Sequence, residues 1–210
     1  MSVSYFIPDL APEDLHRCEE IVRRSRFIVS LAHTPTPEAA KSFIERIKQE
    51  FPDATHNCWA YAAGAPGQTS KVGYSDDGEP HGTAGRPMLQ VLLHCGVGEI
   101  TMVVTRWFGG VKLGTGGLVR AYQDSVRENL ATLPLAEKVP TVELDVQLDY
   151  AHLDRLHRLL PTFEARVCAE AYDQAARVRI CLPEALRGPF EEALAGRTDG
   201  RARCTPVEEA

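Results

Sequence analysis

The sequence has 210 residues, 44% of them hydrophobic and 25% charged, with a formal net charge of −6 at pH 7 and an isoelectric point near 5.7. This composition is that of a globular chain of one large or two small domains, and it excludes a protein coated with positive charge, although a local basic patch is compatible with it. The six cysteines have no CxxC spacing and no run of residues is apolar enough to span a membrane, so we expect buried free thiols in a cytoplasmic protein with no membrane partner.

The first part of the chain predicts strands flanking a helix. Residues 17–33 are typical of a strand pair or of one long bent strand. A helix follows, in which Thr36 is suited to the N-cap, Pro37 to the first helical position, and Pro52 ends the apolar stripe.

Further elements alternate through the middle of the chain. Residues 58–62 predict a strand, and residues 87–95 a buried helix that Gly96 closes. Residues 100–108 are apolar on both faces, which indicates an interior strand, and residues 117–133 carry the apolar spacing of an amphipathic helix.

A domain boundary is predicted at about residues 134–139, where Pro134 and Pro140 bracket a short polar link. We therefore expect one domain over residues 1–136 and another over 137–210. The second part reads, in order, as strand, helix, strand, strand, helix and strand, over 142–148, 153–160, 165–171, 176–182, 185–195 and 202–207. This βαββαβ order is that of a ferredoxin-like domain, in which Pro189 kinks the second helix or marks its true start.

Glycine is concentrated in the middle third, where 13 of the 16 glycines fall between Gly64 and Gly117. The segment 103–117 runs from a buried strand through a glycine turn into a helix that Thr115 could cap. Free N–H groups at such a helix start favour an anion, and a nearby cation or aromatic ring would add phosphate contact or base stacking. The binding residues predicted in this segment are Arg106, Trp107, Phe108, Gly109, Gly110, Lys112, Gly114, Thr115, Gly116 and Gly117.

A second interpretation of the same segment remains open. The glycines can simply permit a tight strand-to-helix connection while Arg106 pairs with an internal carboxylate. No GK[ST] motif is present, and residues 114–119 lack the third glycine of GxGxxG, so no nucleotide cofactor is expected. Neither His56 with Cys58 nor His94 with Cys95 has the usual spacing of a zinc site.

The loop 74–88 gathers acids, a histidine and hydroxyl groups. Asp76, Asp77, Glu79 and His81 are compatible with acid–base chemistry, a divalent metal or direct contact with a partner. They are equally compatible with a turn at residues 76–78 and a helix cap, for which Thr83 is the candidate. The other residues placed on the predicted binding surface are Lys71, Tyr74 and Arg86.

Three motifs together resemble the IMPACT/YigZ family over about residues 15–135. The first is Val103–Gly110 followed by Leu113-Gly114, the second is Ser75–Pro80 with Gly82–Gly85, and the third is Arg24–Ile28. The remainder is similar to the smaller C-terminal domain of the bacterial two-domain members.

The resemblance implies an α+β fold in both domains. The first would share the ribosomal-protein domain 2-like fold, with a left-handed βαβ crossover, found in elongation factor G domain IV. The second would resemble the ferredoxin-like domains of elongation factor G. Because both analogues work on ribosomal RNA, the resemblance implies binding to RNA or the ribosome, or to a translation-factor protein.

Three hypotheses follow for function. The first is a translation-associated binding module that contacts RNA or the ribosome. The second is an enzyme that uses the acidic loop around a small phosphorylated ligand or a metal, and the third is a protein-interaction adaptor. The eukaryotic relatives restrain a kinase of translation initiation with an additional N-terminal domain, for which residues 1–14 are too short, so we do not expect that role here.

Overall fold

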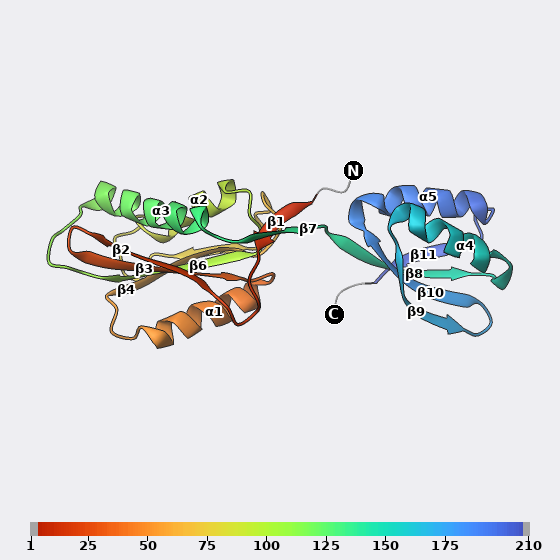
Figure 1. The fold of residues 1–210 in the computed structure, drawn as a ribbon, viewed down its shortest axis with the longest axis horizontal. Helices are drawn as coiled ribbons and strands as arrows, with labels where there is room; N and C mark the ends of the chain where they lie inside the picture. Colours follow the sequence, from red (N-terminus) through yellow and green to blue (C-terminus); the bar gives the residue numbers. More distant parts are fainter. Residues whose placement is uncertain (1–3, 208–210) are drawn as a thin grey trace. The chain divides into compact units, whose positions relative to one another are not determined.

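The computed structural model describes residues 4–207, which divide into two compact units, residues 5–138 and the part that begins at residue 139 (Figure 1). Both units combine helices with antiparallel sheets, so the predicted α+β class is confirmed. Within the described range, no helix has the length and apolar character needed to cross a bilayer.

The first unit is built on a five-stranded sheet in the order β2-β3-β6-β4-β5, and all neighbouring strands are antiparallel. Its strands are β2 (His16–Val22), β3 (Ser25–His33), β4 (His56–Ala62), β5 (Val72–Ser75) and β6 (Ile100–Trp107). β6 is central, as its apolar pattern on both faces predicted. Residues 17–33 form a strand pair, and β5 was not predicted.

Helices cover both faces of this sheet: α1 (Pro37–Glu50) lies on one face, and α2 (Gly85–His94) and α3 (Thr115–Ala131) lie on the other (Figure 1). Alternate residues of β6 therefore enter different cores, since Val104 packs with the α2 and α3 side and Val103 with the α1 side. α1 begins as predicted, because the Thr36 hydroxyl accepts a hydrogen bond from the Ala39 N–H at 3.1 Å.

The two other predicted caps are wrong. α3 begins at Thr115 itself, and its N-cap is Gly114, which makes no side-chain cap. The N-cap of α2 is Ala84, while the Thr83 hydroxyl donates to the Pro80 carbonyl at 2.6 Å.

The predicted polar link at residues 134–139 is instead a strand, β7 (Leu135–Lys138), which pairs antiparallel with β1 (Tyr5–Pro8). The first unit consequently extends to Lys138, so the predicted limit at residue 136 falls inside β7. This two-stranded ribbon brings both ends of the first unit together.

A buried carboxylate fastens the ribbon to the main sheet. Glu99 accepts hydrogen bonds from Tyr5 Oη at 2.7 Å and Lys138 Nζ at 2.5 Å, and its other oxygen lies 2.8 Å from His33 Nε2. Burial by itself raises the pKa of Glu99, but the hydrogen bonds from His33, Lys138 and Tyr5 and the charge of Lys138 outweigh it and lower the pKa to about 2.

Acid is therefore expected to weaken this attachment. Because the folded pKa of Glu99 lies below its usual value of 4.5, its stabilisation is complete above that value and is lost as the pH falls from about 4.5 towards 2. Urea unfolding midpoints measured across this range should fall more steeply for the native protein than for Glu99→Gln. Parallel pH profiles for the two proteins would contradict the assignment.

The second unit is a four-stranded antiparallel sheet in the order β11-β8-β10-β9 with two helices on one face (Figure 1). The βαββαβ order is the one predicted from the sequence. Its elements are β8 (Thr141–Leu148), α4 (Leu153–Leu159), β9 (Arg166–Tyr172), β10 (Ala176–Pro183), α5 (Arg187–Arg197) and β11 (Arg203–Pro206), with 3-10 turns at Tyr150–His152, Leu160–Phe163 and Glu184–Leu186. Pro189 lies in the first turn of α5 and so marks its start.

All six cysteines are free thiols, as expected, but their predicted burial holds only in part. Cys58 is buried in the first unit, whereas Cys168 is exposed on β9 and the other four are partly buried.

Candidate functional site

Arg106, one of the predicted binding residues, is buried at the end of β6 and only 4% exposed. Its Nη1 lies 2.5 Å from Glu79 Oε1, its Nη2 donates to Ser25 Oγ at 3.1 Å, and its guanidinium stands 5.4 Å above the Phe27 ring. Of the two interpretations of this segment, the structure therefore favours the internal ion pair for Arg106 over a phosphate contact.

Glu79 is the centre of a buried polar network. It also accepts a hydrogen bond from Tyr122 Oη at 2.9 Å, and its second oxygen lies 3.9 Å from His56 Nε2. Burial, followed by the charges of Cys58 and Glu79, raises the pKa of Tyr122 well above its ordinary value, which keeps the phenol protonated as a donor. Cys58 Sγ lies 3.3 Å from the same hydroxyl. The network stabilises the fold between the sheet and α3.

The three sequence motifs meet in this network. Ser25 belongs to the motif Arg24–Ile28, Glu79 belongs to Ser75–Pro80, and Arg106 and Gly109 both belong to Val103–Gly110. Besides its bond from Arg106, Ser25 Oγ accepts from the Gly109 N–H at 3.3 Å. We call residues 108–114, which connect β6 to α3, the glycine loop. A Cβ on Gly109 would lie 1.8 Å from the Arg24 carbonyl oxygen, so the glycine loop is in direct contact with the turn between β2 and β3. The motif residues thereby position two surface loops against each other.

The acidic loop forms a turn and a helix cap. The Asp76 carboxylate accepts hydrogen bonds from the N–H groups of Gly82, Ala84 and Gly85 at 2.7, 3.1 and 2.9 Å, which caps α2 in place of the predicted Thr83. Asp77 and Gly78 have φ values of 45° and 87°, and the Glu79 N–H donates to the Asp76 carbonyl across the turn.

The other polar side chains of this loop have separate environments. Asp77 Oδ2 accepts from the Asn57 N–H at 2.7 Å, and its Oδ1 lies 3.3 Å from Lys48 Nζ. The His81 side chain is 99% exposed, with its Nδ1 3.8 Å from Asp76 Oδ2. Nowhere in residues 4–207 do three His, Cys, Asp or Glu side chains gather in a way that could hold a metal ion.

The two aromatic residues after Arg106 are separated by the alternation of the strand. Trp107 lies on the α1 side, where its ring meets Phe51 edge-on at 5.4 Å and its Nε1 donates to Asp53 at 3.0 Å. The guanidinium of Arg26 covers the same ring at 4.9 Å. Phe108 is 46% exposed, and the Arg106 guanidinium lies 5.6 Å from the centre of its ring, so a ligand could stack only on the exposed part of this ring.

Exposed cations surround the glycine loop, and we call Arg23, Arg24, Lys112 and Arg120 the basic rim. Arg23 and Arg24 form the two-residue turn of the β2–β3 hairpin, with φ values of 46° and 69°. In the described part of the chain, neither they nor Lys112 forms a hydrogen bond or ion pair through the side chain. The two hairpin arginines were not predicted as site residues, although Arg24 opens one of the motifs.

A cavity of about 350 Å³ adjoins the basic rim and is mixed in charge. Arg23 and Arg120 line it together with Glu20, Asp124 and Glu128. Burial, followed by the charges of Glu128 and Asp124, raises the pKa of Glu20, although a hydrogen bond from Ser125 opposes this. Arg24 and Lys112 do not line the cavity. These two cations, which are not neutralised by its acids, are therefore the ones available to a ligand at the glycine loop.

The remaining predicted residues are spread over the unit. Gly110, Gly114, Thr115 and Gly116 are exposed in the loop and the first turn of α3, and Gly117 is partly buried behind them. Arg86 is exposed in the first turn of α2, and Tyr74 pairs with Ala60 midway along β4. Lys71 precedes β5, and its carbonyl accepts a hydrogen bond from the N–H of Ala63, just after β4. His56, which pairs with Arg106, is at the other end of β4, and the two ends of this strand are about 20 Å apart at ~3.3 Å per residue. The structure therefore does not bring Lys71 to the glycine loop.

Comparison with known proteins agrees with the architecture. Residues 23–130 match the Impact N-terminal domain, and residues 146–201 match a domain of unknown function, DUF1949. IMPACT family member YigZ of Escherichia coli K12 is 44% identical over 190 residues, covering 90% of this chain and 93% of that protein. Protein IMPACT of Bos taurus is 34% identical over 111 residues, which are 51% of this chain and 34% of that protein.

A solved structure extends the match to the whole fold. This crystal structure, described as that of a hypothetical protein, is 42% identical and has a TM-score of 0.70 over 99% of this chain and 98% of its own. The match to YigZ covers nearly the full length of both proteins, whereas the match to Protein IMPACT covers about half of this chain and a third of that protein. The chain belongs to the IMPACT family.

Proposed function

We propose that this chain is a cytoplasmic, translation-associated protein that binds RNA, on or near the ribosome, through the basic rim. The observation that carries the proposal is the group of three exposed and unpaired cations, Arg23, Arg24 and Lys112, around a glycine loop. The proposal moves the phosphate contacts from Arg106, which is buried, to these neighbouring side chains.

The local geometry suits a phosphate backbone. Guanidinium and ammonium groups neutralise phosphates, and exposed glycines let a backbone approach closely. The first-turn N–H groups of α3 have no side-chain cap and add a fixed positive dipole beside the loop. Phe108 supplies an exposed ring on which a base could stack.

The buried network explains why a rigid platform lies beneath this surface. Ser25 connects the Arg106–Glu79 pair to the glycine loop, and contact with Gly109 holds the hairpin turn that carries Arg24. Fixing the backbone that carries Arg24 lowers the conformational entropy lost on binding, compared with the same side chain on a mobile loop. The buried motif residues Ser25, Glu79 and Arg106 thus support the site without contacting the ligand.

Removing two rim cations is expected to weaken RNA binding. Arg24→Ala/Lys112→Ala should lower the affinity for a labelled single-stranded RNA at least about tenfold. The slope of log affinity against log salt should become shallower by about 1.4, at ~0.7 for each phosphate that is no longer neutralised. Fluorescence anisotropy at several salt concentrations measures both quantities.

Lys71→Ala/Arg86→Ala is the matched control, because it removes two exposed, unpaired cations from the same unit outside the basic rim. It should bind RNA nearly as the native protein does. If the two double variants lose affinity equally, net charge and not the basic rim governs binding. RNA affinity that ignores both salt and the rim substitutions would overturn the proposal.

A further inference from the structure

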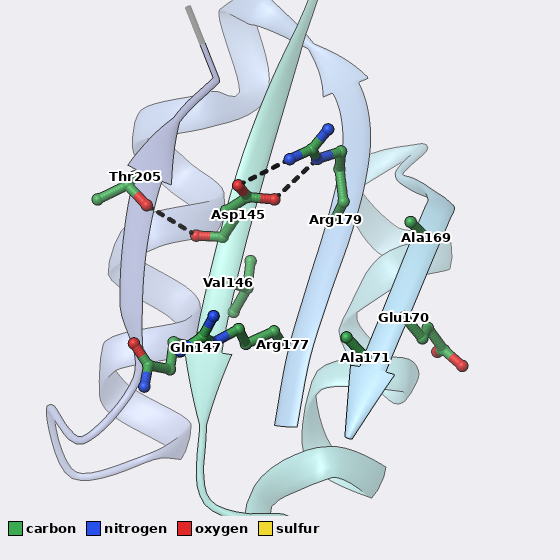
Figure 2. A pocket seen from close by; sticks show the side chains of 9 residues that line it. All are labelled: Asp145, Val146, Gln147, Ala169, Glu170, Ala171, Arg177, Arg179 and Thr205. Carbon is green, nitrogen blue, oxygen red and sulfur yellow. Dashed lines mark hydrogen bonds and ion pairs between the residues drawn. The ribbon is translucent and has the colours of Figure 1, made fainter. Parts of the chain in front are cut away.

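The face of the second unit's sheet that the helices leave open carries two rows of polar side chains (Figure 2). Arg177 and Arg203 stand on either side of Gln147, directly opposite it on the neighbouring strands β10 and β11. Two residues along, Arg179 and Thr205 stand on either side of Asp145 in the same way. We call these the Gln147 row and the Asp145 row.

The Asp145 row is internally neutralised. Asp145 accepts two hydrogen bonds from the Arg179 guanidinium, at 2.8 and 3.0 Å, and these bonds lower the pKa of its carboxyl group (Figure 2). Thr205 Oγ1 donates to the Asp145 carbonyl oxygen at 3.3 Å. This row is therefore held in a fixed geometry without a ligand.

The Gln147 row has two cations and no acid. Within residues 4–207, the side chains of Arg177 and Arg203 form no hydrogen bond or salt bridge, and both are exposed. Strands lie about 4.8 Å apart, so the Cα atoms of Arg177 and Arg203 lie roughly 10 Å from each other with Gln147 between them. An anion placed over Gln147 would be within reach of both.

This positive row contrasts with the charge of the rest of the unit. Residues 139–210 contain nine arginines and no lysine against 13 Asp and Glu, a net charge of −4. The two rows contain three of those arginines and one acid, while Glu143 lies two residues before Asp145 on the same face and Glu170 lines the neighbouring groove. The local attraction for an anion is therefore confined to the Gln147 row.

A shallow groove of about 490 Å³ runs beside the rows (Figure 2). Ala169 and Ala171, opposite Arg179 and Arg177 on β9, leave space above the sheet because their side chains end at Cβ. The centre of a protein–protein interface is rich in large apolar side chains, and the two rows contain none. Arginine planes over an open sheet, with an amide beside them, suit the phosphates and bases of single-stranded RNA.

We propose that the open sheet face of the second unit is a separate contact for single-stranded RNA, in which Arg177 and Arg203 neutralise phosphates and Gln147 hydrogen-bonds the sugar or base. It deepens the proposed function and rests on that function's choice of RNA as the ligand, but it involves no residue of the basic rim. The Asp145–Arg179 pair positions the neighbouring row, and the groove over the two alanines receives a base.

The test uses the full chain and a labelled single-stranded RNA of about 20 nucleotides. Arg177→Ala/Arg203→Ala should weaken binding at least about tenfold and make the salt slope shallower by about 1.4. Arg177→Lys/Arg203→Lys should recover most of the slope, since it keeps the charge, but not all of the affinity, since it loses the planar guanidinium. Circular dichroism and thermal melting establish that each variant is folded.

Arg158→Ala/Arg197→Ala is the control, because these two arginines lie on the helices α4 and α5 that cover the opposite face. It makes the same change in net charge and should leave binding nearly unchanged. Sheet-face variants that bind RNA as the native protein does would overturn the inference. Displacement of the RNA by polyglutamate at equal charge concentration would also overturn it, because the face would then accept an acidic protein segment equally well.

The two RNA proposals fail independently. If only the Arg24→Ala/Lys112→Ala variant loses affinity, the basic rim stands and the sheet-face contact falls. If only the Arg177→Ala/Arg203→Ala variant loses affinity, the sheet face stands and the basic rim falls. A decrease in both variants supports two contacts on one RNA.

Discussion

Replacement of Glu79 with Ala is expected to lower the free energy of unfolding by about 3–5 kcal/mol. The substitution leaves the Arg106 guanidinium buried at the end of β6 without its carboxylate, and it also removes the acceptor of the Tyr122 hydroxyl. A buried charge that loses its partner bears the full cost of desolvation, which is why one substitution has so large an effect.

A double variant separates the cost of an unpaired charge from the contribution of the pair. Arg106→Met/Glu79→Met replaces both groups with apolar side chains, so it should be less destabilised than Glu79→Ala alone. Lys48→Ala removes the partly exposed contact with Asp77 and should cost less than about 1 kcal/mol. Urea unfolding of the three variants measures these differences. A Glu79→Ala protein within about 1 kcal/mol of the native value would show that the pair does not stabilise the fold.

Elements with a strong local pattern were predictable from the sequence. The run of apolar residues around Val103 identified a central strand because both of its faces are covered. Thr36 and Pro37 located the start of α1 because capping depends on side chains within three residues of each other. In the second unit, regular alternation and short connections were sufficient to give the order of all six main elements.

Features that depend on partners distant in sequence were not predictable. β7 contains Glu137 and Lys138 and has a polar pattern, and it becomes a strand only because β1, about 130 residues earlier, pairs with it. Thr83 and Thr115 are residues of a type that often caps helices. However, Asp76 caps α2 from the other end of the acidic loop, and the residue at the N-cap of α3 is Gly114.

The candidate site shows the same division. Strand alternation alone places Arg106 and Trp107 on opposite faces of the sheet, which the predicted binding surface did not take into account. The partner of Arg106 could not be found in this way, because Glu79 is 27 residues away in a loop of several acids. Arg23 and Arg24 join the glycine loop only through the fold of the β2–β3 hairpin.

Replacement of Gly109 with Ala should be the other strongly destabilising change, at about 3 kcal/mol. A Cβ at this position would lie 1.8 Å from the Arg24 carbonyl oxygen and 2.1 Å from its carbon, and a backbone group cannot rotate away as a side chain can. The glycine loop and the hairpin turn must therefore separate, which also breaks the hydrogen bond from Gly109 to Ser25. Because the turn carries two cations of the basic rim, RNA affinity should fall as well, even at temperatures where the variant remains folded.

Gly116→Ala is the matched control for this change. Gly116 lies in the first turn of α3, and a Cβ there would meet nothing within 4 Å. Alanine favours the helix over glycine, so this variant should be more stable than the native protein by about 0.5–1 kcal/mol. Thermal unfolding of both variants distinguishes a requirement for close approach at Gly109 from general loop flexibility. If Gly109→Ala were as stable as Gly116→Ala, the contact between loop and hairpin would not be holding the basic rim in place, and the rim would have to be positioned by other contacts.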